Sequence, residues 1–296
     1  MCTMKKKFQM IGFALSVLLV TLPVVTVGAD NAASGKQKKE KTTESALGVK
    51  PVTGSWINLA YKDVRNKYTN PQSFDNMDPK LWEAKVRELS AMGIGYLVLM
   101  EVANEGKSYY PSQIMPWWYN KDKKSPVDAI LDEAAKHNMK IFMSSGWAKD
   151  QDDNLLDPAI KERQLRIMEE LASLYKNHKA FYGWYLPVED CLCPIFAEHA
   201  VQSVNTLSEK AKKLAPGKKT LISPYGIGLS EFDNPEYEKQ MQKLKVDIIA
   251  YQDEVGCVRD QFTLPRLKKN WQRLRDIHNR LNIEMWANCE TFTWEE

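Results

Sequence analysis

The stretch Phe181–Asp190, FYGWYLPVED, decides the fold of this chain. It is a short aromatic and apolar run that ends abruptly in two acids, Glu189 and Asp190. A short apolar run bounded by a polar loop is typical of a buried parallel strand. A second such run, Ile283–Glu290 (IEMWANCE), ends in Glu290. Because the chemistry of a parallel α/β barrel lies at the carboxyl ends of its strands, the pattern predicts a barrel whose mouth holds Glu189 and Glu290 facing each other.

The same alternation of strand and helix runs through the rest of the chain. Seven apolar stretches have the length and bounds of strands: Ser55–Tyr61, Ile94–Met100, Met139–Ser145, Phe181–Val188, Lys219–Ser223, Val246–Tyr251 and Ile283–Asn288. Helical patterns fill the gaps, and four begin with a capping side chain followed by proline: Asp78-Pro79, Ser125-Pro126, Asp157-Pro158 and Asn234-Pro235. The alternation and spacing favour a (β/α)8 TIM barrel over a doubly wound sheet, which would need a Gly-rich phosphate loop after its first strand.

An eighth strand is missing from this pattern. One more strand–helix unit would place it at about position 320, but the chain stops at Glu296, just past the seventh strand. We therefore expect a TIM barrel truncated after strand 7, with two strand edges left unpaired.

The amino-terminal residues have the features of a secretory signal peptide. Lysines precede an apolar run over residues 11–27, and Val27-Gly28-Ala29 resembles a small-residue cleavage site. A membrane anchor is the alternative for this run, and no later segment is apolar enough to span a bilayer. The next residues are polar and lysine-rich, as in a flexible linker. We expect an exported protein, periplasmic or extracellular, with a signal peptide (1–29), a linker (30–50) and one barrel (51–296).

Charge and composition exclude several classes of partner. The chain carries +3, but residues 1–50 hold eight lysines and three acids, so residues 51–296 carry −2. This balance gives the domain no basic footprint for nucleic acid. No HExxH or comparable ligand set occurs, so we expect neither a metal site nor a cofactor. Nothing in the sequence specifies an oligomeric state.

The cysteines are too few for a disulfide scaffold in a domain of this size. Four remain after removal of the leader: Cys191, Cys193, Cys257 and Cys289. A single disulfide from Cys257 to Cys191 or Cys193 is an open alternative. A cysteine metal site has less support.

Acidic residues follow most of the predicted strands. They are Asp63, Glu101, Glu105, Asp150, Glu189, Asp190, Asp253, Glu254 and Glu290. Most of them, Glu105, Asp150 and Glu254 above all, are expected to be solvated loop residues. Glu189 and Glu290 differ because each directly ends an apolar strand. Alternation along the last strand puts Asn288 and Glu290 on one face, which suits a pocket.

Aromatic residues crowd the same predicted end of the barrel. Trp117-Trp118-Tyr119 lies in a long polar loop, where a core role is less natural, and Trp147 follows the third strand. For Tyr185 and Trp286 a core role is favoured. Exposed aromatic faces stack on sugar rings while polar neighbours hold the hydroxyl groups. Two carboxylates in such a mouth point to glycoside cleavage.

Four motifs resemble those of an uncharacterised bacterial family of glycosidase-like TIM barrels, common in gut Bacteroidetes and known as a domain of unknown function (DUF4434-like). The motifs are GSWINLAY, WYLPVE, YQDEVG and WANCETF, within residues 52–294. The wider resemblance is to clan A glycoside hydrolases, which carry an acid/base Glu after strand four and a nucleophile Glu after strand seven. Glu189 and Glu290 match these positions. Val188 stands where the clan usually has Asn, and Asp253 has no counterpart in the clan scheme.

The expected protein is an exported glycoside hydrolase that cleaves a glycan by a two-carboxylate, retaining mechanism. Glu189 is the predicted general acid/base, and Glu290 is the predicted nucleophile, with Tyr251 or Asn288 as its hydrogen-bond partner. The residues expected to contact the carbohydrate are Asp253, Asn288, Tyr251, Tyr185, Trp147, Trp118, Trp117 and Glu101. The alternative is a barrel that binds glycans without cleaving them, or a fragment left inactive by truncation.

Overall fold

Seven parallel strands form the main sheet of this protein. The structure is a computed structural model that describes residues 51–59, 78–104, 106–146, 155–188, 193–256 and 263–291. In spatial order the strands are β1 (Gly54–Ile57), β2 (Tyr96–Leu99), β5 (Lys140–Ser144), β6 (Phe181–Tyr185), β7 (Lys219–Ile222), β8 (Ile248–Gln252) and β9 (Glu284–Asn288). All neighbouring pairs are parallel, and the spatial order equals the chain order, as barrel winding requires. Each of the seven predicted strands is present.

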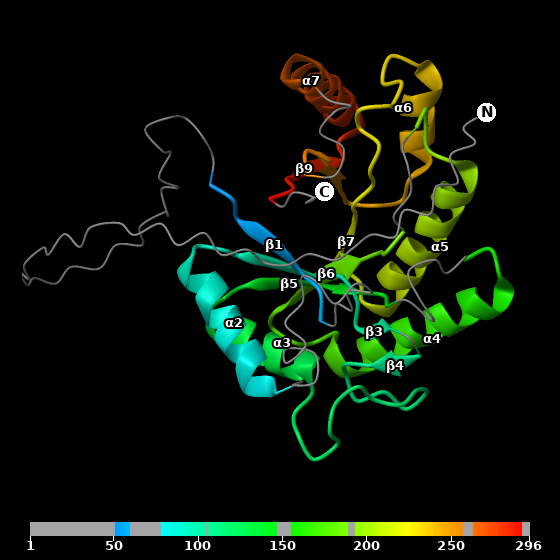
Figure 1. The fold of residues 1–296 in the computed structure, drawn as a ribbon. Helices are drawn as coiled ribbons and strands as arrows, with labels where there is room; N and C mark the ends of the chain where they lie inside the picture. Colours follow the sequence, from blue (N-terminus) through cyan, green and yellow to red (C-terminus); the bar gives the residue numbers. More distant parts are fainter. Residues whose placement is uncertain are drawn as a thin grey trace, which may run out of the picture.

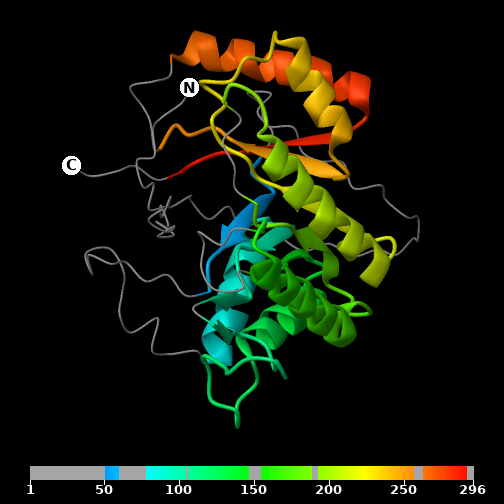
Figure 2. The ribbon, with the colours of Figure 1, turned by 90° about the vertical axis from the view of Figure 1, so that its right-hand side faces the viewer.

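Helices cover the outer face of this sheet (Figure 1). They are α2 (Pro79–Ala91), α3 (Pro126–Lys136), α4 (Pro158–Tyr175), α5 (Glu198–Leu214), α6 (Pro235–Lys243) and α7 (Leu264–Leu281). At the four predicted starts, the side chain before the proline accepts a backbone N–H of the first turn, so these starts are confirmed. Figure 2 shows α6 and α7 over β8 and β9, with α2, α3 and α4 over the other half of the sheet.

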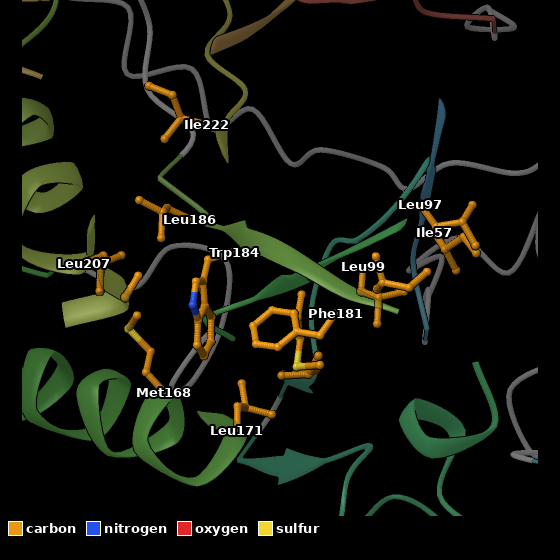
Figure 3. Packing of buried hydrophobic residues seen from close by; sticks show 14 of the residues in the cluster. Ile57, Leu97, Leu99, Met168, Leu171, Phe181, Trp184, Leu186, Leu207 and Ile222 are labelled. Atoms are coloured by element: carbon orange, nitrogen blue, oxygen red, sulfur yellow. The ribbon is translucent and has the colours of Figure 1, made fainter. Parts of the chain in front are cut away.

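The two faces of the sheet pack into different cores. Toward the helices, Phe181 and Trp184 of β6 point at Met168 and Leu171 of α4 (Figure 3). Inside the curled sheet lies a smaller interior cluster, formed by Val98, Phe142, Tyr185, Leu221, Ile248 and Ala250, with Trp56, Tyr96, Tyr182 and Trp286 packed against it. Apolar residues on both faces explain why the strands read as nearly continuous apolar runs.

The barrel is open at the position of an eighth strand. Among the described residues, β1 and β9 are the two ends of the sheet and do not pair with each other. Aromatic rings still reach across the interior, because Trp286 of β9 lies 5.2 Å from Tyr96 of β2 and 5.6 Å from Phe142 of β5, both edge to face. The expected seven-stranded, incomplete TIM barrel is therefore confirmed, with its curvature held by interior packing.

A register shift next to β6 decides which way its aromatic residues face. Phe142 pairs with Gly183, although its neighbour Ile141 pairs with Phe181, so Tyr182 is an extra residue. The shift needs glycine, because a Cβ at position 183 would stand 2.6 Å from the Phe142 ring. It puts Tyr182 and Tyr185 on the same inner face, where plain alternation would separate them.

The predicted signal peptide and linker lie outside the described residues and stay predictions. In the part of the chain that the structure describes, no helix is long and apolar enough to cross a membrane.

Candidate active site

A layer of polar side chains lies directly beyond the interior cluster, at the carboxyl ends of the strands. It consists of Ser144, Ser223, Gln252 and Asn288, each two positions after an interior residue of its strand and so on the inner face. Asn288 Nδ2 donates to Ser223 Oγ at 3.1 Å, and Gln252 Nε2 donates to the Ser223 carbonyl at 2.9 Å. We call these four residues the polar floor, because they separate the apolar interior from the barrel mouth.

Glu290 stands two positions beyond Asn288 and continues the same face of β9. Its Oε2 accepts the backbone N–H of Gly256 at 2.9 Å. Its own backbone N–H donates to Oδ1 of Asp253 at 3.0 Å, and the Asp253 N–H donates to the Asn288 carbonyl at 3.1 Å. These bonds tie the ends of β8 and β9 together. They place Asp253 beside Glu290 and orient the Glu290 carboxylate.

Glu254 joins this pair, contrary to the expectation that it is a solvated loop acid. Its Oε2 accepts the N–H of Gly226 at 2.8 Å, and its backbone has a left-handed φ of 55°. Burial, reinforced by the negative charges of Glu290 and Asp253, raises the pKa of the Glu254 carboxyl to about 7, although backbone N–H groups oppose the shift. Glu254 is therefore a non-glycine residue with a positive φ and a strongly shifted pKa. Both features are typical of functional sites.

We call Asp253, Glu254 and Glu290 the carboxylate cluster. Each of them accepts a backbone N–H from a loop at the mouth, so the cluster joins the ends of β7, β8 and β9. No signal in the sequence separates Glu254 from ordinary loop acids except its position next to Asp253.

Glu101 is anchored inside the protein rather than presented at the mouth. It follows β2 and is completely buried. Its Oε1 accepts the backbone N–H of Leu59 at a distance of 3.0 Å. Leu59 comes just after β1, so the Glu101 carboxylate ties the ends of the first two strands. The predicted sugar contact is replaced by a structural link, because a fully buried side chain has no surface to offer a ligand.

Tyr251 points away from the carboxylate cluster. Ile248 and Ala250 of β8 belong to the interior cluster, so alternation puts Tyr251 on the outer face, toward the helices. Its hydroxyl group is 2.8 Å from Nε2 of His278 on α7, and burial raises the pKa of the phenol. The prediction that Tyr251 lines the site is therefore wrong, because a strand buried on both faces carries no polar alternation that would reveal its inner side.

Tyr185 lies on the inner face, as a buried member of the interior cluster at the end of β6. Its register partner on β5 is Ser144 of the polar floor. Its contribution is to fill the barrel beneath the mouth.

Trp117 and Trp118 form stacks of their own, in the loop between β2 and α3. Trp117 stacks on Tyr119 at 5.1 Å and donates its Nε1–H to the Ser112 carbonyl at 2.8 Å. Trp118 stacks on Tyr109 at 6.2 Å. Both indoles are half-buried against the core that faces the helices.

The loop that carries these tryptophans is held against α4. Tyr110 and Ser112 donate their hydroxyl hydrogens to Glu170 of α4 at 2.9 and 2.6 Å. Figure 1 shows the small hairpin of this loop, β3 (Ala103–Asn104) and β4 (Lys107–Ser108), beside α4 and away from β9. The structure therefore does not bring Trp117 and Trp118 to the carboxylate cluster.

Glu189 and Trp147 lie outside the described residues, and their predicted roles stay predictions. The described part of β6 leads to Val188, and β6 is three strands from β9 in the sheet order. Tyr185 near the end of β6 and Trp286 of β9 pack in the same interior cluster. Cys191 and Cys257 also lie outside these ranges, so the predicted disulfide stays open.

Comparison with known proteins agrees with the glycosidase-like barrel expected from the sequence. Residues 52–296 match the family described as "Domain of unknown function (DUF4434)". No curated protein sequence matches the chain. A Bacteroides thetaiotaomicron VPI-5482 protein, described as a "putative alpha-L-fucosidase", has a TM-score of 0.60 at 18% identity, over 88% of this chain and 79% of that one.

Other glycoside hydrolases are similar at a lower level. A family 5 glycoside hydrolase from Bacteroides vulgatus ATCC 8482 has a TM-score of 0.47 at 12% identity, over 74% of this chain and 46% of that one. The intracellular xylanase TsXylA of Thermoanaerobacterium saccharolyticum has a TM-score of 0.44 at 15% identity, over 70% and 69%. At 18% identity, the comparison with the Bacteroides thetaiotaomicron protein shows the fold and nothing about activity.

Proposed function

This chain belongs to the DUF4434 family of domains of unknown function, and on that premise we propose that it is an exported glycoside hydrolase. The observation that carries the proposal is the position of Glu290. Its carboxylate stands at the barrel mouth, oriented by Gly256 and beside Asp253, above the polar floor. In a parallel barrel this is the end where catalytic groups gather. The glycosidase-like fold supports the same reaction class.

In the proposed mechanism Glu290 is the nucleophile and Glu189 the general acid/base. Retaining cleavage needs one carboxylate to attack the sugar and one carboxylic acid to protonate the leaving group, with the two groups about 5–5.5 Å apart. The Gly256 N–H donates to Oε2 of Glu290 and so helps to orient the carboxylate that attacks the sugar. Asn288, the half-buried member of the polar floor, is the residue that we assign to hydrogen bonds with sugar hydroxyl groups.

Glu254 is a second candidate for the proton donor. A carboxyl group with a pKa of about 7 keeps its proton near neutral pH, which is what a general acid requires. Its position next to Glu290 supports this role, whereas its bond to Gly226 favours a structural one. Comparison of the Glu189→Gln and Glu254→Gln variants on one substrate distinguishes them, because only loss of the true donor is compensated by a better leaving group.

The deciding experiment is a screen of the full chain on aryl glycosides and polysaccharides, followed by Glu290→Gln. We expect turnover to fall by more than about 10³-fold, with binding and folding retained, because the variant keeps the size of the side chain but cannot attack. Glu231→Gln is the matched control, since Glu231 is an exposed acid in the loop after β7. Unchanged turnover in Glu290→Gln would refute the assignment.

Glycan binding without cleavage is the alternative function. The opening between β1 and β9, which do not pair with each other among the described residues, favours it because it leaves that side of the site uncovered. Saturable binding to a glycan that is never cleaved, with binding lost on changing Asn288 or Asp253, would support the alternative.

Export is the further part of the proposal. The lysines, the apolar run and Val27-Gly28-Ala29 support cleavage after Ala29. Amino-terminal sequencing of the protein from a bacterial host checks this, and we expect a mature chain that begins at Asp30. A mature chain that still begins at Met1 would contradict it.

A further inference from the structure

A separate pocket lies at the opposite, amino-terminal end of the barrel. It has a volume of ≈ 290 Å³ and lies between the starts of β5, β6 and β7 and the end of α3. Its lining consists of Ala135, Asn138, Met139, Lys140, Lys179, Phe181, Tyr182, Gly217 and Lys218. We call it the lysine pocket, because three of these residues are lysines and none is acidic.

Among the described residues, the ammonium groups of Lys179 and Lys218 donate to neutral acceptors. Lys179 Nζ donates to Asn138 Oδ1 at 3.1 Å and reaches the Ala135 carbonyl at 3.5 Å. Lys218 Nζ donates to the Phe181 carbonyl. Within the described ranges, neither lysine forms an ion pair. The end of α3 favours Lys179, because the helix dipole stabilises a cation there.

Lys140 completes the set from the first position of β5. Its Nζ donates to the Tyr96 hydroxyl at 3.1 Å and stands over the ring of Tyr182, 4.7 Å from the centroid. Glu284 of β9 acts on Lys140 only as a minor electrostatic neighbour, and its Oε1 is bound to Trp286 Nε1 at 2.7 Å. Lys140 therefore also lacks a direct carboxylate partner in the described structure.

Lysines elsewhere on the described surface are commonly paired with acids. Examples are Lys124 with Asp132, Lys136 with Glu133, Lys239 with Glu236 and Lys243 with Glu198. The lysine pocket is different, and burial without a counter-charge lowers the pKa of the Lys218 ammonium. An anion in the pocket would supply the missing charge.

We propose that the lysine pocket binds an oxyanion, namely a phosphate or sulfate group, either free or carried by a sugar. Ammonium donors form short, charge-assisted hydrogen bonds with such oxygens, and the Asn138 amide is a further neutral donor at the rim. The volume is near the lower bound of about 300–1,000 Å³ for ligand pockets, which suits a small anion or a monosaccharide that carries one.

Calorimetric titration of the full chain tests this, with sodium phosphate, sodium sulfate, glucose 6-phosphate and glucose 6-sulfate as probes. Sodium chloride keeps the ionic strength constant, because non-specific screening would otherwise mimic binding. We expect saturable binding of one anion per chain. Tighter binding of the sugar-borne groups identifies a modified glycan as the ligand, and equal or weaker binding identifies the free anion.

The variant Lys140→Gln/Lys179→Gln should weaken this binding at least tenfold. Both side chains are exposed, so the fold should survive, which circular dichroism checks. Lys239→Gln on α6 is the matched control and should leave affinity unchanged. No saturable heat with any of the four probes, or full affinity in the folded double variant, would overturn the proposal.

Discussion

The two ends of this barrel hold charges of opposite sign. At the carboxyl end, the carboxylate cluster of Asp253, Glu254 and Glu290 brings negative charges together and satisfies them with backbone N–H groups. At the amino end, the lysine pocket brings positive charges together and satisfies them with carbonyl, amide and phenol oxygens. Among the described residues, the three lysines of the pocket form no salt bridge with an acid, unlike many other lysines of the surface.

Helix dipoles explain part of this difference. Helices in a parallel barrel begin at the carboxyl ends of the strands and end at the amino ends, so acids are favoured at one face and lysines at the other. The dipoles do not account for Glu254, whose pKa is raised by burial and by the nearby negative charges of Glu290 and Asp253. Such groups cost folding free energy, which makes the carboxyl end the better candidate for chemistry.

The largest expected effect concerns the proposed acid at the carboxyl end. Glu189→Gln should slow hydrolysis of glycosides with poor leaving groups by about 10²–10⁴-fold, the usual contribution of a general acid. Activated aryl glycosides should lose much less, because their leaving groups need little protonation. Rates measured across a series of leaving groups check this. An equal loss on all substrates would assign Glu189 a different role.

The next effect concerns the aromatic packing across the interior of the barrel. Trp286→Ala should lower the free energy of unfolding by about 3 kcal/mol, because it removes the ring that contacts both Tyr96 and Phe142 across the open interior. Urea denaturation measures the change. Leu264→Ala is the control, since that side chain is 80% exposed and should change stability by less than about 0.5 kcal/mol. Equal, small losses in both variants would mean that the interior does not hold the curvature.

The pH dependence of stability tests the electrostatics of the carboxylate cluster. The pKa of Glu254 is raised from 4.5 to about 7, so between these values the folded state binds more protons than the unfolded state. The contribution of Glu254 is therefore fully present below pH 4.5 and is lost as the pH rises through 7. The shift corresponds to at most about 3 kcal/mol.

Unfolding free energies measured from pH 5 to pH 8 should therefore fall less steeply for Glu254→Gln than for the natural chain. Glu231→Gln, which removes one exposed acid from the same end, is the control for the change in net charge. Identical slopes in all three proteins would show that Glu254 is not the group that titrates.

The features that were predictable from the sequence are those with local causes. Apolar runs mark the seven strands, and a capping side chain before proline marks four helix starts, because neighbouring residues alone produce these signals. The pairing of Asp253 with Glu290 follows from the adjacency of two parallel strands.

The features that were not predictable depend on distant contacts. The sequence does not reveal which face of β8 points into the barrel, because both faces are apolar. For this reason the sequence prediction put Tyr251 on the wrong face. The direction of Tyr185 depends on a register shift that is possible only because Gly183 meets Phe142. The burial of Glu254 is set by a loop after β7 that begins far earlier in the chain.

The smallest expected effect distinguishes Trp118, in the loop held to α4, from Trp147, which follows β5. Trp118 stacks on Tyr109 and carries the Lys107 ammonium 4.4 Å from its ring centroid, in a loop held to α4 by Glu170. Trp118→Ala should therefore lower stability by about 1 kcal/mol and change affinity for a glycan ligand by less than about twofold, ~0.4 kcal/mol. Trp147→Ala is the matched comparison, since Trp147 follows β5, whose carboxyl end contributes Ser144 to the polar floor. Denaturation and glycan titration on both variants separate the effects. A large loss of affinity in Trp118→Ala would return this loop to the binding site and extend the site along the side of the barrel.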